Sequence, residues 1–163
     1  MADDFRRLPP DVLRAHRETV LLRLLMRTAQ IELNELVRRL RAMGHVALQA
    51  SYVGVLGNVD TEGTRVVTLA SRLGTSRQAA GQLVNAIAAA GFLERHPDPD
   101  DGRGVLVKHT AAGRDLLADA LAEMADVEAG YEAVIGAKRM TALKRALTDI
   151  AESTDPASAL RQR

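Results

Sequence analysis

The chain has 163 residues, with 22 Lys and Arg against 21 Asp and Glu, no cysteine and no tryptophan. This length suits one domain that buries roughly 70% of its unfolded surface. No apolar run approaches the ~20 residues that span a bilayer, so we expect no membrane partner. The N-terminus lacks a hydrophobic signal segment, which favours the cytoplasm. The absence of cysteine excludes disulfides, thiolate nucleophiles and Cys-based zinc sites.

The first part of the chain predicts a short arm followed by a long helix. Residues 1–10 are charged and end in two prolines, which indicates a flexible arm. A helical pattern then runs from Val12 to Met43 and stops at Gly44, so residues 11–45 form one segment. Its larger apolar stripe comprises Leu22, Leu25, Met26, Ala29, Leu33, Leu36, Val37, Leu40 and Met43.

A second apolar stripe on this helix contains Leu13, Val20, Leu24 and Ile31. A helix that is apolar on two sides must be buried on two sides. The heptad-like spacing of the second stripe favours a partner subunit, with dimer contacts at Leu13, Val20 and Leu24. The alternative is a break near Gln30 into two ordinary amphipathic helices.

Residues 46–110 predict a compact lobe of alternating short elements. A helix over Val46–Leu56 precedes a turn-rich loop and a strand candidate over Thr64–Val67. Thr68 is predicted to cap a short helix over Leu69–Leu73, and Gly74 makes the turn into the next helix. Arg65, next to the strand, is placed to contact a DNA backbone.

The helix from Thr75 to about Ala90 has the pattern expected of a DNA-recognition helix. Thr75 and Gln78 have capping-box spacing, and Gly91 is a natural helix stop. Ala80, Leu83, Val84, Ile87 and Ala90 gather on one side at 100° per residue. The opposite side carries Gln78, Gly81, Gln82, Asn85 and Ala89, with Arg77 at its edge. Amides pair with adenine edges, and small residues let a helix approach bases.

Two strand-like runs follow, Phe92–His96 and Val105–His109, joined by a loop that contains two prolines and two glycines. This is the order of a helix-turn-helix with a β-hairpin wing. Arg103 lies between glycines at the loop tip, where it suits a narrow minor groove. Asp101 is the candidate to orient it, and a plain surface ion pair with Asp101 or Asp100 is the alternative.

The remainder predicts two helices and a tail. Thr110 caps a helix that runs to about Tyr131, and a last helix spans Lys138–Ala151, so residues 111–151 form a C-terminal segment. Leu143, Leu147 and Ile150 line one side of the last helix and are predicted dimer contacts. Residues 152–163 form a polar tail that we expect to be disordered. The window from Arg65 to Arg114 holds seven basic and four acidic residues, which suits a polyanion partner.

The chain resembles the MarR (multiple-antibiotic-resistance-regulator) family of winged-helix transcription factors over roughly Leu22–Ala151. The resemblance rests on Leu69-Ala70-Ser71-Arg72-Leu73-Gly74, Ser76-Arg77-Gln78, Leu83-Val84, Gly91-Phe92-Leu93-Glu94-Arg95, Asp98-Pro99-Asp100-Asp101-Gly102-Arg103 and Thr110-Ala111-Ala112-Gly113. It implies a mainly helical α+β fold, with a small wing and long N- and C-terminal dimerisation helices. It also implies a homodimer on a pseudo-palindromic operator. Gly102 stands where many relatives carry a charge, and aromatic residues are few, so an aromatic-lined effector pocket is not expected.

We therefore expect a sequence-specific regulator, with repression favoured, that binds double-stranded DNA without a cofactor. The expected DNA contacts are Arg65, Thr75, Ser76, Arg77, Gln78, Gln82, Asn85, Arg103 and Lys108. A small-molecule effector is left open, and its site is unknown.

Three other functions were weighed. An enzyme is disfavoured because the four histidines are scattered and no catalytic motif is present. A metal-responsive regulator would need His and acidic residues to converge, and no metal site is predicted. A winged-helix module that binds protein would show apolar residues where Gln78, Gln82 and Asn85 stand.

Overall fold

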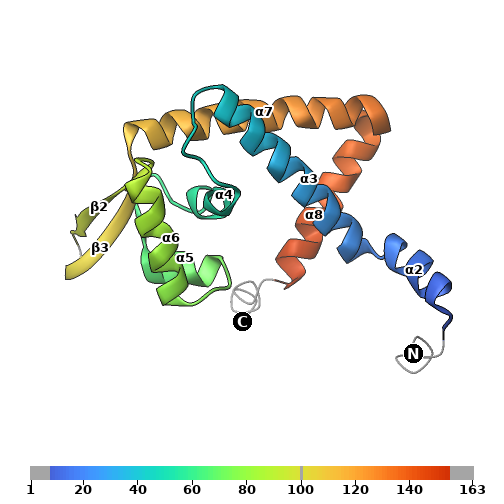
Figure 1. Cartoon of the computed structure of the whole chain (residues 1–163), viewed down its shortest axis with the longest axis horizontal. Helices are drawn as coiled ribbons and strands as arrows, with labels where there is room; N and C mark the ends of the chain where they lie inside the picture. The colour runs from blue at the N-terminus through green and yellow to red at the C-terminus, as the bar shows by residue number, and fades with distance from the viewer. Residues whose placement is uncertain (1–7, 100, 155–163) are drawn as a thin grey trace. The chain divides into compact units, whose positions relative to one another are not determined.

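The computed structural model describes residues 8–99 and 101–154, and the side chains of residues 101–104 fall outside that description. The elements in chain order (Figure 1) are α2 (Pro10–Thr19), α3 (Leu21–Ala42), α4 (Ala50–Leu56), β1 (Thr64–Arg65), α5 (Val66–Arg72), α6 (Arg77–Ala89), β2 (Leu93–Asp98), β3 (Asp101–His109), α7 (Ala111–Ile135) and α8 (Ala137–Thr154). They form two compact units, residues 1–120 and 121–163, which divide within α7. The mainly helical fold with a small antiparallel sheet is the predicted one. Over the described ranges, no helix is both long and apolar enough to cross a membrane.

The core of the first unit lies where α3, α4, α5, α6, the sheet and the start of α7 meet. Its most deeply buried side chains, all under 2% exposed, are Leu40, Leu48, Val55, Leu69, Val84, Ile87 and Val107. Burying a side chain of this size contributes roughly 1.5–3 kcal/mol. These contacts hold the α5–α6 pair against the sheet, so the orientation of α6 is set by the core.

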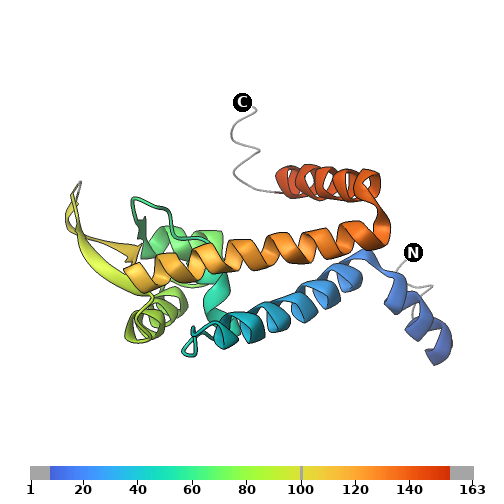
Figure 2. The same cartoon turned by 90° about the horizontal axis from the view of Figure 1, so that it is seen from above.

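The sheet has the order β1-β3-β2 with antiparallel neighbours. β2 and β3 form a hairpin that projects beyond the helices of the unit (Figures 1 and 2). The strands extend into the segment predicted as loop, because Asp98 pairs with Asp101 after an irregularity at Pro97. Pro97 is tolerated there because β2 is an edge strand, where a missing donor costs no ladder bond.

A set of hydrogen bonds joins the residues that follow α6 to the start of α7. Thr110 donates its backbone N–H to the Phe92 carbonyl at 3.1 Å and its hydroxyl to the Gly91 carbonyl at 2.6 Å. The same hydroxyl accepts the N–H of Gly113 at 3.0 Å, so Thr110 caps α7 as predicted. Gly113 has no room for a side chain, because an added Cβ would lie 2.0 Å from the Phe92 oxygen.

The predicted single helix over Val12–Met43 was wrong. The chain leaves helical geometry at Val20, with ψ 130°, and resumes as α3. The Thr19 hydroxyl donates to the His16 carbonyl at 2.9 Å, and Arg23 bridges the break to Glu18 with bonds of 2.8 and 3.2 Å. Two successive β-branched residues, Thr19 and Val20, favour such an extended point. The alternative of a break near Gln30 was also misplaced, because Gln30 lies within α3.

Several shorter elements differ from their predicted bounds. Residues 46–49 precede α4, whose helix begins only at Ala50. β1 ends at Arg65, so α5 begins at Val66 and Thr68 lies inside it instead of capping it. Of the predicted arm, residues 1–7 lie outside the described residues, as do residues 155–163 of the predicted tail. α8 continues past Ala151 to Thr154.

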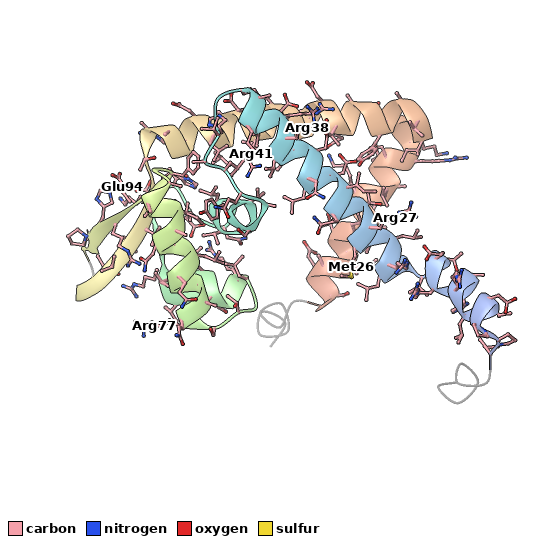
Figure 3. All side chains as sticks on the ribbon, in the orientation of Figure 1. Met26, Arg27, Arg38, Arg41, Arg77 and Glu94 are labelled. Carbon is pink, nitrogen blue, oxygen red and sulfur yellow. The ribbon has the colours of Figure 1, made fainter. Side chains whose placement is uncertain are left out.

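In the first unit, the apolar side chains of α2 and the N-terminal half of α3 are exposed. α2 buries none of its residues, and α3 buries only Leu36, Val37 and Leu40. The exposed fractions of the predicted dimer residues are 37% for Leu13, 42% for Val20 and 46% for Leu24. The larger stripe also stays exposed at its start, with Leu22 and Met26 each 65% exposed. Figure 3 shows Met26 on this half of α3, while Arg38 and Arg41 lie near its other end.

In the second unit, Gly136 turns the chain between α7 and α8 with φ +84°. Met140 is buried, and Lys144 donates to Glu128 at 2.7 Å across the two helices. Leu143 and Ile150 are 45% and 46% exposed, and Leu147 is half-buried. The predicted contact side of α8 is therefore accessible in this chain alone.

Gly113→Ala should lower the free energy of unfolding by about 2–3 kcal/mol, because its Cβ would overlap a backbone carbonyl that cannot move alone. Gly130 in the same helix is the matched control, since nothing lies within 4 Å of an added Cβ there. Gly130→Ala should stabilise by about 0.5–1 kcal/mol through helix propensity. Urea unfolding of both variants measures the difference, and equal effects of the same sign would contradict the packing argument.

Candidate nucleic-acid interface

α6 presents one polar, uncharged side. Ala80, Val84 and Ile87 are buried in the core, whereas Gln78, Gln82 and Asn85 are exposed. Arg77 is exposed at the first turn, and Figure 3 shows it at the end of α6 remote from Glu94. The helix therefore displays amide groups over about two turns, which suits contact with base edges in a groove.

The helix begins one residue later than the capping box predicted. Ser76 is the N-cap, and its hydroxyl accepts the N–H of Ala79 at 3.1 Å. Thr75 belongs to the preceding turn, where its N–H donates to the Ala70 carbonyl at 3.0 Å. The Thr75–Gln78 cap was therefore wrong. Two hydroxyl residues in succession make the sequence ambiguous, and the turn at Gly74, with φ +59°, selects the second.

Gly81 lies within α6 at a position that the fold does not need to keep small. No atom lies within 4 Å of an added Cβ, and its φ is not positive. Glycine inside a helix costs roughly 0.5–1 kcal/mol relative to alanine. The low profile of the helix at Gly81 suits close approach of another molecule.

An ion pair with a buried carboxylate lies at the turn end of the wing, where β2 ends. Arg65 donates Nε to Oδ2 of Asp98 at 2.5 Å, and the Asp98 side chain is only 2% exposed. The two residues belong to opposite edge strands, β1 and β2, so the bond spans the sheet. Sequence reasoning named Arg65 but assigned no role to Asp98. The sequence signal for Asp98 was weak, because an acidic residue between two prolines can equally well lie on the surface.

Lys108 and Arg65 line the same open groove of about 470 Å³, together with Glu62, Pro97 and Leu106. Lys108 is half-buried in β3, opposite Glu94 in β2. The expected DNA contacts thus fall into two groups, one on α6 and one at this groove. Arg103 and its proposed partner Asp101 belong to β3, but their side chains lie outside the described residues.

Arg72 stabilises the fold of the first unit through hydrogen bonds. It donates to the Asn58 carbonyl at 2.7 Å and to Asp60 at 2.9 Å. These bonds, with a contribution from the Thr64 hydroxyl, hold the pKa of Asp60 below its usual value. Arg72 therefore ties the loop before β1 to α5.

His109, at the end of β3, is buried beside Gly113. Burial lowers its pKa, and the nearby positive charge of Arg114 acts in the same direction. Of the other histidines, His45 bonds Asp119 at 2.7 Å and His96 lies 3.0 Å from Glu94. No group of three metal-ligating side chains is found among the described residues.

Arg95 was not among the expected contacts, yet it lies against α6. Its Nη2 donates to Oδ1 of Asn85 at 2.7 Å, so a wing-strand cation contacts the polar side of the recognition helix. Sequence alone could not identify this pair, because ten positions and a turn separate the two residues.

Comparison with known proteins shows which family this chain is similar to. Residues 48–104 match the model of the MarR family. A MarR-family transcriptional regulator from Rhodococcus sp. RHA1 is 25% identical, with 83% of this chain and 98% of that chain covered and a TM-score of 0.65. CouR from Rhodococcus jostii RHA1, solved with p-coumaroyl-CoA, is 25% identical over 82% of this chain and 93% of that one, with a TM-score of 0.64.

The wild-type apo MarR of E. coli has the same fold, with a TM-score of 0.63 and 23% identity over 80% of this chain and 96% of that chain. Among curated proteins, no sequence matches this chain.

Arg65→Met should lower the free energy of unfolding by about 2 kcal/mol, because it removes the charge-assisted hydrogen bond from the Arg65 guanidinium to the buried Asp98 carboxylate. The value lies below the full cost of a broken buried pair because Arg65 itself is half exposed. Lys108→Met, in the adjacent strand, is the control and should change stability by less than about 0.5 kcal/mol. Chemical unfolding distinguishes the two, and an equal loss in both variants would show that the ion pair contributes nothing.

Proposed function

We propose that this chain, which belongs to the MarR family of winged-helix transcriptional regulators, acts as a homodimeric repressor on a pseudo-palindromic DNA operator. The observation that carries the proposal is the exposed, uncharged amide side of α6, held beside a projecting hairpin. An α-helix fits the major groove of B-DNA, where amides discriminate bases. An arginine near the tip of a hairpin, here Arg103, suits the adjacent minor groove.

The proposed division of labour follows the two groups of residues. Gln78, Gln82 and Asn85 contact base edges, and Arg77 at the start of α6 contacts phosphate. Arg65 and Lys108 contact the DNA backbone from the groove that they line beside the wing, while Arg103 enters the minor groove. Ser76 contributes through its capped backbone, because helix N-termini favour phosphate contact.

The dimer is supported by apolar surface that each unit leaves exposed. α2 buries no residue, and the start of α3 exposes large apolar side chains. A ten-residue helix has little stability in water without such burial. A second copy of the chain that covers Leu13, Val20 and Leu24, with Leu143, Leu147 and Ile150 of α8, would bury these residues.

An effector is proposed by analogy only. CouR is solved with p-coumaroyl-CoA, and release from DNA on binding such a molecule would make the repressor inducible. A protein-binding module is the second candidate function, but the polar residues on the outer side of α6 disfavour it. Binding of double-stranded DNA discriminates the two.

The DNA-binding proposal is tested with DNA from upstream of the protein's own gene and random-sequence competitor. Fluorescence anisotropy at two salt concentrations should give tight, competitor-resistant binding with a steep salt dependence. Gln82→Ala should relax base preference, and Arg103→Ala should weaken binding by about 1–3 kcal/mol. If both variants bind a selected operator as the wild type does, the assigned contacts are wrong; if no double-stranded DNA binds, the protein-binding function is favoured.

Leu24→Glu should convert the dimer to monomer, because a carboxylate would be buried against the partner's apolar side chains. Val46→Glu is the matched control, since Val46 is 76% exposed and lies outside the proposed interface. Light scattering with size-exclusion chromatography measures both variants. A monomeric wild type, or dissociation by both substitutions, would contradict the proposed interface.

A further inference from the structure

The contact between Asn85 and Arg95 changes which hydrogen-bonding groups α6 presents to DNA. Both side chains are exposed, and Arg95 Nη2 donates to Asn85 Oδ1 at 2.7 Å. This distance is typical of a charge-assisted hydrogen bond, which is stronger than one between neutral groups. The amide and the guanidinium therefore meet DNA as one unit.

The strand register sets the side of β2 from which the Arg95 side chain projects. Side chains alternate along a strand, so Arg95 projects from the same side of β2 as Leu93, which is 2% exposed. Its partner in the antiparallel register is Val107, which is fully buried. Directly opposite residues lie side by side, so Arg95 begins beside Val107, and its exposed end reaches Asn85.

The neighbouring acidic residue does not compete for Arg95. Glu94 projects from the other side of β2, where it lies 3.0 Å from His96 and opposite Lys108. Among the side chains that the structure describes, Arg95 has no carboxylate partner. Its positive charge remains available at the surface of α6.

The hydrogen-bonding capacity of the pair is mostly that of a donor. Asn85 uses one of the two lone pairs of Oδ1 on Arg95 and keeps both Nδ2 hydrogens as donors. Arg95 has no acceptor and retains the rest of its five N–H groups. Adenine in the major groove presents one acceptor, N7, and one donor, the N6 amino group, whereas guanine presents two acceptors, N7 and O6.

We propose that Asn85 and Arg95 together select guanine in each half of the operator, where an asparagine by itself would favour adenine. The inference rests on the proposed DNA-binding function and adds a base preference to it. Guanine N7 and O6 accept hydrogen bonds from the pair. An adenine amino group at the same place would face mainly N–H donors, with one lone pair of Asn85 Oδ1 already used by Arg95, and a lost hydrogen bond to water is costly in a buried interface.

The test is selection of binding sites from a randomised double-stranded DNA pool by the full-length protein, followed by affinity measurement on the selected site. The wild type should enrich guanine at one position of each half-site. Replacing it by adenine should weaken wild-type binding roughly 10-fold, within the range for a good bidentate contact. Asn85→Ala and Arg95→Ala should each abolish most of this preference, and the double variant should lose no more than either single variant.

Two further variants separate base selection from charge and folding. Arg95→Lys keeps the positive charge without the planar fork, so it should retain salt-dependent binding but lose the guanine preference. Arg77→Ala removes the proposed phosphate contact of the same helix, so it should weaken binding to all sequences alike and keep the guanine preference. Thermal unfolding followed by circular dichroism should show the same Tm for all four single variants within a few degrees.

Three outcomes would overturn the inference. If Arg95→Ala weakens every sequence equally and reduces the salt slope by about one ion, Arg95 contacts phosphate and does not select a base. If the wild type enriches adenine at the position that Asn85 controls, the amide acts without Arg95. If the wild type enriches no sequence at all, the proposed operator binding fails first, which distinguishes that failure from the other two.

Discussion

The structure depends on the junction at which α6, the wing and α7 meet within a few ångströms. The carbonyls of Gly91 and Phe92 both accept hydrogen bonds from Thr110, and Gly113 approaches so closely that no side chain fits. Because β2 starts at Leu93 and β3 ends at His109, the same bonds close the base of the hairpin. The recognition helix, the wing strands and the first turn of α7 therefore cannot be displaced independently at this point.

The core of the first unit explains how the outer side of α6 remains free for another molecule. Val84 and Ile87 are fully buried, so the opposite side must face outward. Gly81 on this side lowers the stability of the helix without any packing reason. Residues that the fold does not require, gathered on one side of a helix beside a basic strand, are best explained by a partner that does require them.

One ion pair joins the two edge strands of the sheet that forms the wing. The side chain of Asp101, expected to orient an arginine at the tip, lies outside the described residues, and the described ion pair near the turn joins Asp98 to Arg65. A buried carboxylate that binds the opposite edge strand stiffens the sheet from which the tip extends. Arg95 is fixed in a similar way, by the Val107 side of the sheet and by Asn85. Rigid placement of these cations lowers the entropy lost when they contact DNA.

Local patterns in the sequence were sufficient for the fold class, the helix-turn-helix and the inward side of α6. Periodicity depends on residues only a turn apart, and glycines such as Gly91 mark helix ends through their own backbone freedom. The break at Val20, the choice of Ser76 over Thr75 as N-cap, and the Asp98–Arg65 and Asn85–Arg95 contacts depended on the tertiary structure. Each is decided by competition between locally similar options, or by residues that approach only after the sheet has formed on α6. A single sequence does not encode those distances in any local pattern.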